Sequence, residues 1–504
     1  MEIDIDHELS RLIGFALSHG LIEREDIAWA ANGLIDALGR HAFLRDDAAL
    51  DDAELPHMIS PEPILERILD WAVGEGLIQG TIVERDLLDT RLMGILTPRP
   101  SDVAARFRAL LDVSPRAATD WAHALGVSSN YIRAARSARD VRWKTTTEHG
   151  ELDITINLAK PEKDPRDIAK ARSAPVGYPQ CLLCRENEGF AGHVGHPARQ
   201  TLRLFPLELR GERWYLQYSP YSYYDEHCIV LSERHVPMRI CRATFERLIE
   251  LVSIFPHYFF GSNADLPIVG GSILSHDHYQ GGRYIFPIER APIERTYAAP
   301  RVEAGRVAWP MSALRLASPD AEALIDVASR VLGAWREWDD PSVGILAESD
   351  GAPLNTITPI ARRRGDVFEL DLVLRNARTS EEHPLGVFHP HADVQHIKKE
   401  NIGLIEVMGL AILPARLKGA LDGLAEAWAK GEGDLSARPE LAAHDAWYRG
   451  LRARRPDTPS EDVPTALREE VGRAFFKVLC DSGVYARDPE GLAAFDRFAT
   501  AALS

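Results

Sequence analysis

The sequence predicts an α+β protein in which a mixed or antiparallel sheet core lies between helical regions at both ends of the chain. Apolar residues recur at helical spacing in the first 140 residues, and short alternating runs follow after residue 143. Long apolar segments return near the C-terminus. We therefore expect four regions, which are a helical region over 1–140, two similar sheet-containing regions over 141–300 and 301–430, and a helical region over 431–504.

The N-terminal region is expected to be helical. Trp29, Leu34 and Leu38 follow near-helical spacing, and another helix is expected over Pro61 to Leu77, with prolines near its start. The acidic stretch 45–54 is expected to be a solvated loop.

Residues 117–135 resemble a helix-turn-helix with Gly126 in the turn. DNA binding and a simple pair of packed helices are both open for this stretch.

The sheet is expected to begin after Trp143, because Leu152 to Leu158 alternates as a half-buried strand does. A strand–helix–strand order then occurs twice, which suggests a degenerate internal repeat. The expected strands are 214–217, 228–232 and 283–286, then 314–316, 355–360 and 367–374, and the expected helices are 245–255 and 321–338. At the C-terminal end, 401–413 and 469–479 are expected to be helical, with a linker over 452–464.

Charge and composition narrow the function classes. The chain has 504 residues, a formal net charge of −17 and five cysteines. An acidic excess disfavours a nucleic-acid surface, and five cysteines do not make a disulfide scaffold. We see no apolar run long enough to span a membrane and no signal peptide at the N-terminus, so we expect a cytoplasmic protein without a membrane partner.

The stretch His276-Asp277-His278-Tyr279-Gln280 points most directly to chemistry. In an extended segment the two imidazoles and the carboxamide would share one face, just after the glycine-rich run 269–272. Such a surface suits attack on a phosphate ester. The alternative is a pair of ordinary histidines at a strand end.

Cys181 and Cys184 have the C-x₂-C spacing that closes a turn around one metal ion, and zinc accepts sulfur and nitrogen in tetrahedral geometry. The other ligands would have to be distant imidazoles. A redox pair or two ordinary buried cysteines are the alternatives. The candidate imidazoles are His193, His196, His227, His235 and His276.

The chain also contains four spaced segments that together closely resemble the second, bacterial type of galactose-1-phosphate uridylyltransferase, within the histidine-triad superfamily. The resemblance runs from about residue 130 to the end, and the helical N-terminus is similar as well. The segments are 178–189 (YPQCLLCRENEG), 218–228 (YSPYSYYDEHC), 276–280 (HDHYQ) and 396–403 (HIKKENIG).

The resemblance implies that UMP is exchanged between UDP-glucose and galactose 1-phosphate, with His278 as the nucleophile and Gln280 supporting the phosphoryl group. It also implies a structural zinc ion held by Cys181, Cys184, His235 and His276. His389 and His391 stand where the first type has a second metal. Leu354 replaces a His of the relatives, which argues against that second ion. The dimer of the first type suggests a homodimer.

Several residues are expected to contact substrate. Backbone N–H groups around Gly271 and Ser272 are expected to cradle phosphate oxygens, and the resemblance assigns Lys398 and Lys399 to the hexose phosphate. Asn263 and Asp265 are candidates for uracil or ribose contacts, with simple turn chemistry equally open.

Two further basic groups are candidates for phosphate contact. For Arg362, Arg363 and Arg364 a solvated hairpin turn is expected rather than phosphate binding. Phosphate contact and an exposed surface are both open for Lys160, Lys163 and Arg166.

Two other functions remain as alternatives. A nucleotide hydrolase or phosphorylase of the histidine-triad superfamily would use the same nucleophile. However, hydrolases of this group carry a third His where Gln280 stands. A zinc-stabilised DNA-binding regulator would use residues 117–135, against the acidic charge of the chain.

Overall fold

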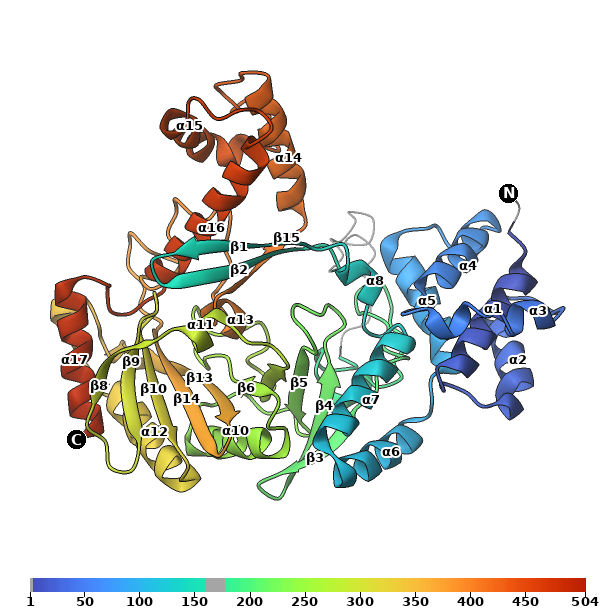
Figure 1. Ribbon diagram of the computed structural model, residues 1–504, viewed down its shortest axis with the longest axis horizontal. Helices are drawn as coiled ribbons and strands as arrows, with labels where there is room; N and C mark the ends of the chain where they lie inside the picture. Colours follow the sequence, from blue (N-terminus) through green and yellow to red (C-terminus); the bar gives the residue numbers. More distant parts are fainter. Residues whose placement is uncertain (1–2, 160–176) are drawn as a thin grey trace. The chain divides into compact units, whose positions relative to one another are not determined.

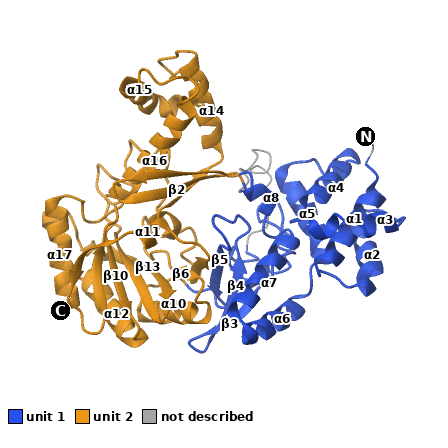
Figure 2. Ribbon diagram, in the orientation of Figure 1, with its two compact units in different colours: residues 1–139, 159–236 blue, residues 140–158, 237–504 orange. Residues whose placement is uncertain are grey.

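A computed structural model describes residues 3–159 and 177–504 of the chain (Figure 1). They form two compact units, one from residues 1–139 and 159–236, and one from 140–158 and 237–504 (Figure 2). The division into four regions expected from the sequence stays a prediction.

Unit 1 combines a helical N-terminal part with a three-stranded antiparallel ladder. Three of its longer helices begin at polar caps, since Asp4, Thr81 and Ser114 each accept hydrogen bonds from first-turn N–H groups. In the ladder, β4 pairs with β3 on one side and β5 on the other. The elements are α1 (Ile5–Ser18), α2 (Ile27–Ala37), α3 (Asp47–Leu50), α4 (Glu62–Gly74), α5 (Ile82–Leu96), α6 (Pro100–Val113), α7 (Pro115–Ser128), α8 (Ala134–Ser137), β3 (Phe205–Leu209), β4 (Glu212–Tyr218) and β5 (Cys228–Ser232).

Unit 2 is built on an antiparallel sheet with the order β7-β6-β13-β14-β10-β9-β8. The helices α10 and α12 pack against this sheet (Figure 1). Its elements are α10 (Arg242–Ile254), β6 (Phe259–Gly261), β7 (His278–Gly282), α11 (Pro287–Arg290), β8 (Ile293–Tyr297), β9 (Glu303–Val307), β10 (Ala313–Ser318), α12 (Ala321–Arg336), β11 (Glu348–Ser349), β12 (Ala352–Pro353), β13 (Asn355–Arg364) and β14 (Val367–Asn376).

The remaining part of unit 2 holds a second, small sheet and the C-terminal helices. β2 pairs antiparallel with β1 and parallel with β15, although β15 lies some 250 residues further along the chain. The elements are β1 (Val141–Thr147), β2 (Gly150–Asn157), α13 (Leu404–Val407), β15 (Leu410–Pro414), α14 (Arg416–Ala429), α15 (Asp445–Arg454), α16 (Val463–Asp481) and α17 (Pro489–Leu503).

The element order along the chain is consistent with the suspected internal repeat. Three antiparallel strands, a helix and two further antiparallel strands occur as β3-β4-β5-α10-β6-β7 and again as β8-β9-β10-α12-β13-β14, with the short pair β11-β12 inserted in the second copy. The predicted α+β class is confirmed.

The central strands β13 and β14 separate apolar from charged residues by their alternation. Leu370, Leu372 and Leu374 point to one side of β14, whereas Glu369, Asp371 and Arg375 point to the other, and all six are buried. The charged side is covered by backbone from residues 288–291 and 402, whose carbonyls accept hydrogen bonds from arginines of the sheet. This charged side matters for the site described below.

Several local predictions were wrong. Residues 283–286 form no strand, because the chain leaves β7 at Gly282 and turns into α11. Residues 401–413 are not one helix, since only Leu404–Val407 is helical and β15 follows. The tertiary pairing of β15 with β2 overrides the apolar pattern. The stretch 45–54 is not simply a solvated loop, because it contains α3, whose Ala49 and Leu50 are buried.

The prediction of a helix-turn-helix over residues 117–135 was also wrong. α7 runs through Gly126 without a turn, and the following helix, α8, has four residues. A recognition helix is therefore not formed at 117–135.

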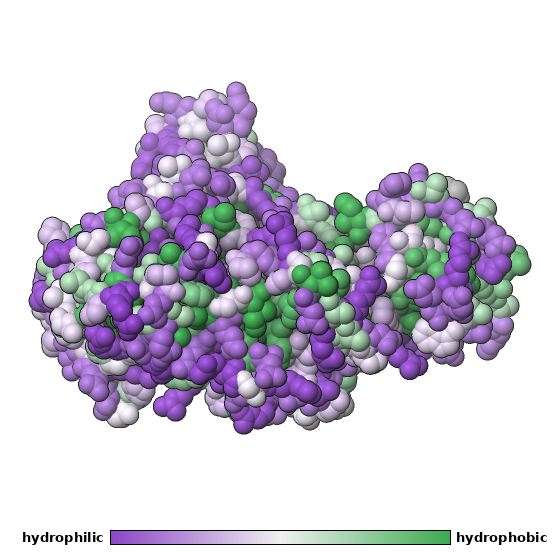
Figure 3. Space-filling model, turned by 60° about the horizontal axis from the view of Figure 1, so that its bottom comes forward, coloured by the Kyte–Doolittle hydropathy of each residue, from purple (hydrophilic) through white to green (hydrophobic). Residues whose placement is uncertain are grey.

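The surface is mostly hydrophilic on the face drawn in Figure 3, with hydrophobic residues in smaller patches. Among the described helices, none combines the length and the apolar character that crossing a bilayer requires.

Candidate active site and metal centre

His278 is the first residue of β7, and the backbone there is tightly packed. β7 pairs antiparallel with β6, with Gln280 opposite Gly261. A Cβ at Gly281 would lie 2.4 Å from the Phe260 ring, so this position accepts only glycine without rearrangement. The strand that carries His278 and Gln280 is therefore held firmly against its neighbour.

The His278 ring has a defined tautomer. Its Nδ1 lies 2.8 Å from the carbonyl oxygen of His276. A carbonyl only accepts hydrogen bonds, so Nδ1 carries the proton and Nε2 keeps its lone pair. Burial lowers the pKa of His278 to about 4, which keeps the ring neutral at physiological pH. The arrangement leaves one ring nitrogen as a nucleophile.

The side chains of the motif alternate between the two faces of the chain, as expected for an extended segment. His278 and Gln280 share one face of β7, whereas His276 lies just before the strand begins and is fully buried. Asp277 faces away and lies 3.7 Å from Arg247 in an ion pair.

A possible metal-ligand group is present in unit 1. The sulfur atoms of Cys181 and Cys184 lie 3.5 Å apart, and Cys184 Sγ lies 3.1 Å from Nδ1 of His235. All three ligand atoms lie within 4.8 Å of one another, as tetrahedral coordination of one ion requires. Of the candidate imidazoles in this unit, His235 lies beside the two sulfur atoms, and its role as a metal ligand stays a prediction.

The cysteine turn is shaped for such a group. The Leu183 N–H donates to Cys181 Sγ, and Asn187 Nδ2 donates to the carbonyls of both cysteines at 2.8 Å. His196 is occupied by Asn187 and is not a ligand here. Burial and the nearby Cys181 raise the pKa of the Cys184 thiol, so without a cation it stays protonated.

Asn263 and Asp265 make structural contacts. Asn263 Oδ1 accepts from the Leu404 N–H at 2.8 Å, and its amide packs so closely on Gly271 that a Cβ there would lie 2.4 Å away. Both oxygens of Asp265 accept hydrogen bonds, from Ile240 N and Thr356 Oγ1. These contacts favour the turn chemistry that the sequence left open. Ser272 is exposed.

The two lysines of the 396–403 segment differ. Lys398 is buried and its Nζ lies 2.9 Å from Glu406 Oε1, while Lys399 is exposed. Glu406 also accepts from the Gly403 N–H. Glu406 thus fixes the segment, although no sequence motif points to it.

Arg362 corrects another expectation. It is buried rather than solvated, because it forms ion pairs with Asp371 and Glu369 on the charged side of the sheet. Arg364 is partly exposed at the hairpin, as expected. Lys160, Lys163 and Arg166 lie outside the described residues.

His389 and His391 face the protein's own groups. His389 Nδ1 lies 3.3 Å from the Pro390 carbonyl, and His391 lies 3.1 Å from the Val387 carbonyl through Nε2 and 3.6 Å from Asp481 through Nδ1.

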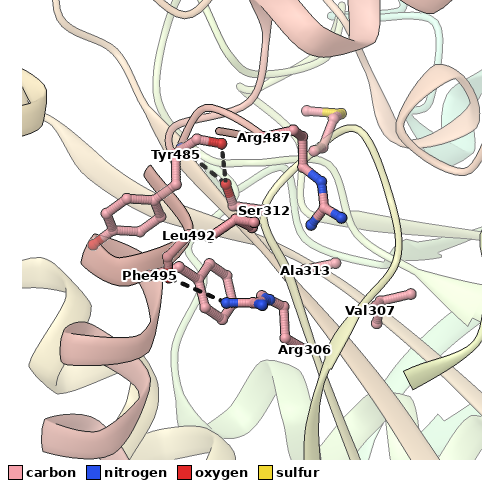
Figure 4. Close-up of a pocket in the computed structure, with 9 residues that line it drawn as sticks. Arg306, Val307, Ser312, Ala313, Tyr485, Arg487, Leu492 and Phe495 are labelled. Atoms are coloured by element: carbon pink, nitrogen blue, oxygen red, sulfur yellow. Dashed lines mark hydrogen bonds between the residues drawn. The ribbon is translucent and has the colours of Figure 1, made fainter. Parts of the chain in front are cut away.

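A separate pocket in unit 2 has an empty volume of about 200 Å³, open solvent included (Figure 4). Its two arginines are compensated, Arg306 by Glu294 and Asp496, and Arg487 by Glu294. We assign it no role.

Comparison with known proteins decides the family. The N-terminal domain model of galactose-1-phosphate uridyl transferase matches residues 36–237, and the C-terminal domain model matches residues 250–444. The chain belongs to this family. Together the two matches contain Cys181, Cys184, His235, His278 and Gln280.

Relatives of this uridyl transferase family match over nearly the whole chain. Galactose-1-phosphate uridylyltransferase of Clostridium acetobutylicum is 50% identical over 98% of this chain and 99% of its own length. The enzymes of Halalkalibacterium halodurans and Bacillus subtilis are 49% and 46% identical and are covered over 97% of their lengths. A solved structure, yeast Ap4A phosphorylase Apa2, aligns with a TM-score of 0.31 and 13% identity over 59% of this chain and 88% of its own, which is too weak for an argument.

Proposed function

We propose that the protein exchanges UMP between UDP-glucose and galactose 1-phosphate, giving glucose 1-phosphate and UDP-galactose. The observation that carries the proposal is the buried, neutral His278, whose Nδ1 is tied to the His276 carbonyl and whose Nε2 keeps its lone pair. Family membership supplies the substrate class.

The reaction proceeds in two displacements. Nε2 of His278 attacks the α-phosphorus of UDP-glucose, the bond from that phosphorus to the bridging oxygen breaks, and glucose 1-phosphate leaves with the bond electrons. A phosphate oxygen of galactose 1-phosphate then attacks the same phosphorus and displaces the imidazole. As the ring becomes positively charged in the first step, the Nδ1–H bond to the His276 carbonyl strengthens and stabilises the intermediate.

Gln280 explains why transfer is favoured over hydrolysis. Its carboxamide shares the face of β7 with His278 and can donate a hydrogen bond to a phosphoryl oxygen, but it cannot titrate. Hexose phosphates leave without protonation, so a third proton-shuttling histidine is not needed. An amide at position 280 therefore favours the transferase over the hydrolase or phosphorylase alternative.

We also propose that Cys181, Cys184, His235 and His276 hold a structural zinc ion. The spacing of the first three ligand atoms fits tetrahedral coordination, and the family resemblance supplies His276 as the fourth. A zinc ion bound there would make the thiols thiolates. Through His276 it would anchor the backbone whose carbonyl fixes the His278 tautomer.

Incubation with UDP-glucose alone tests the proposal. Transfer chemistry gives one burst of glucose 1-phosphate, stoichiometric with enzyme, and leaves labelled UMP bound to the denatured chain at His278. Continuous UMP release supports hydrolysis instead.

The variant His278→Gly should give no burst and bind no label. His41→Gly, which changes an exposed histidine, should behave as wild type. Label found on any other residue would refute the assignment of the nucleophile.

A further inference from the structure

The charged side of the unit 2 sheet contains one arginine, Arg375, that lacks the carboxylate partners of the neighbouring arginines. Arg315 and Arg362 lie 2.6 and 2.8 Å from oxygens of Asp371, and Arg306 pairs with Glu294 and Asp496. A buried guanidinium is expensive unless it is paired, and these three follow that rule.

Arg203 shows the other way to bury an arginine. Its guanidinium has no carboxylate partner among the described residues. However, it donates to four backbone carbonyls, those of Thr97, Pro98, Gln200 and Leu202, at 2.6–3.2 Å. Because its N–H groups have acceptors, Arg203 is a structural residue.

Arg375 follows neither pattern. It is 1% exposed, its Nη1 lies 3.0 Å from the Ile402 carbonyl and 3.4 Å from Thr358 Oγ1, and its buried Nε has no acceptor. In the described part of the chain no carboxylate oxygen lies within 4.0 Å of it. A guanidinium has five N–H donors, so Arg375 has a donor without an acceptor and no directly paired carboxylate.

The strand register places this arginine beside the nucleophile. β7 and β13 run in the same direction, because each is antiparallel to β6. Gln280 and Ile360 both lie opposite Gly261, so Thr358 is level with His278, two strands away or about 10 Å. The Arg375 side chain reaches Thr358 and shares that side of the sheet, since Val373 pairs with Thr358.

The segment 396–403, whose lysines the family resemblance assigns to the hexose phosphate, lies against Arg375. The Ile402 carbonyl contacts Arg375, and Glu406 pairs with Lys398. Lys398 is paired with two carboxylates, Glu406 at 2.9 Å and Glu400 at 3.7 Å. Its charge is therefore compensated, whereas Arg375 forms no ion pair among the described residues.

We propose that Arg375 binds the phosphate group of hexose 1-phosphate, and the equivalent β-phosphate of the UDP-sugar, with Lys398 held beside it by Glu406. The proposal rests on the proposed function. A phosphate supplies both things Arg375 lacks, namely negative charge and acceptors in a geometry that a guanidinium matches with two hydrogen bonds.

Equilibrium binding of galactose 1-phosphate, measured by titration calorimetry, tests this. Arg375→Met should weaken binding about ten- to a hundred-fold, because a charge-assisted hydrogen-bonded pair is lost. Its Tm should stay the same or rise, since an uncompensated buried charge is removed. Arg375→Lys should recover part of the affinity because it keeps the charge.

Arg203→Met is the matched control. It should lower Tm, because four carbonyls lose their donor, and leave galactose 1-phosphate affinity unchanged. The proposal is overturned if Arg375→Met lowers Tm as Arg203→Met does while binding galactose 1-phosphate like wild type. If Arg375→Met does not fold, wild-type affinity in Arg375→Lys and in Arg375→Gln overturns it equally.

These experiments distinguish an error in the role of Arg375 from an error in the proposed function. Wild-type protein that takes up UMP from UDP-glucose, combined with unchanged affinity in the Arg375 variants, refutes only the role of Arg375. Wild-type protein that never takes up UMP refutes the function. In that case the loss of phosphate affinity in Arg375→Met still reports on the anion site.

Discussion

One hydrogen bond at His278 determines which ring nitrogen can react. The acceptor is the carbonyl two residues earlier in the same chain, so the bond depends on how the backbone enters β7 and not on a distant side chain. A buried imidazole would be a weak nucleophile if its proton sat on the wrong nitrogen. Tautomer selection by the backbone avoids this, and the second-neighbour spacing of the motif is what makes it possible.

Gln280→Ala should lower the rate of uridylyl transfer about 10²–10³-fold, because one positioned donor to the phosphoryl group is removed. Gln280→Glu, which keeps the shape but places a negative charge against phosphate, should be slower still. Single-turnover release of glucose 1-phosphate from UDP-glucose measures both. Ser349→Ala, an exposed change in β11, serves as the control. Equal rates for Gln280→Ala and wild type would remove Gln280 from the mechanism.

Among the elements, the cysteine turn is the clearest case of a local structure formed around a ligand set. Asn187 donates hydrogen bonds to both cysteine carbonyls, and the Leu183 N–H donates to Cys181 Sγ, so the turn brings the two sulfur atoms together. His235 then comes from just after β5.

We predict about one zinc ion per chain by elemental analysis. Cys184→Ser should abolish zinc binding and lower Tm by several degrees, because ion binding stabilises the folded state. The control is Cys480→Ser, which changes a cysteine of α16 outside the ligand group. Zinc content that is the same in Cys184→Ser and wild type would contradict the assignment.

Replacing glycine by alanine is expected to have opposite effects on stability in strand β7 and in helix α12. Gly281→Ala should destabilise the protein by about 1–3 kcal/mol, because its Cβ would overlap the Phe260 ring. Gly333→Ala should stabilise it by about 0.5–1 kcal/mol, since position 333 is an exposed helix interior with nothing within 4 Å of the new Cβ. Urea unfolding measures both. Destabilisation by both substitutions would show that the packing at Gly281 is not the cause.

At the scale of the whole molecule, stability should depend on pH through a partly buried histidine pair. The Nδ1 atoms of His396 and His444 lie 2.8 Å apart. Burial, followed by the neighbouring His444, lowers the pKa of His396 to about 4, and burial also lowers the pKa of His444. The unfolded chain takes up these protons near pH 6.5 and the folded chain only at lower pH. The free energy of unfolding therefore falls as pH drops through this window.

Calorimetric Tm values between pH 7.5 and 4.5 check this prediction. The decrease of Tm toward acid pH should be shallower in His396→Gln than in wild type, whereas His41→Gln should follow wild type. Identical slopes for His396→Gln and wild type would show that the pair does not control acid stability.

Homodimer formation and a cytoplasmic location stay predictions. The DNA-binding alternative loses its motif, because α7 passes through Gly126 as a continuous helix.

Local patterns predicted much of the fold, and their failures share a cause. The strands predicted at 228–232, 355–360 and 367–374 and the helix predicted at 321–338 are present, because alternation and helical periodicity are properties of the chain itself. The errors at 283–286 and 401–413 arose where an apolar run fits several structures. Whether Leu410–Pro414 becomes a strand depends on pairing with β2, which the run itself does not encode.

By itself the sequence determined the family, the candidate nucleophile and the cysteine turn, because these depend on residue types at short, fixed spacings. Only the tertiary structure decided the tautomer of His278, the burial of Arg362, the structural contacts of Asp265 and the isolation of Arg375. Each of these is a matter of which partner lies within about 3 Å. Strands distant in the chain supply or withhold that partner, and a guanidinium or imidazole has its chemistry set by what it can donate to.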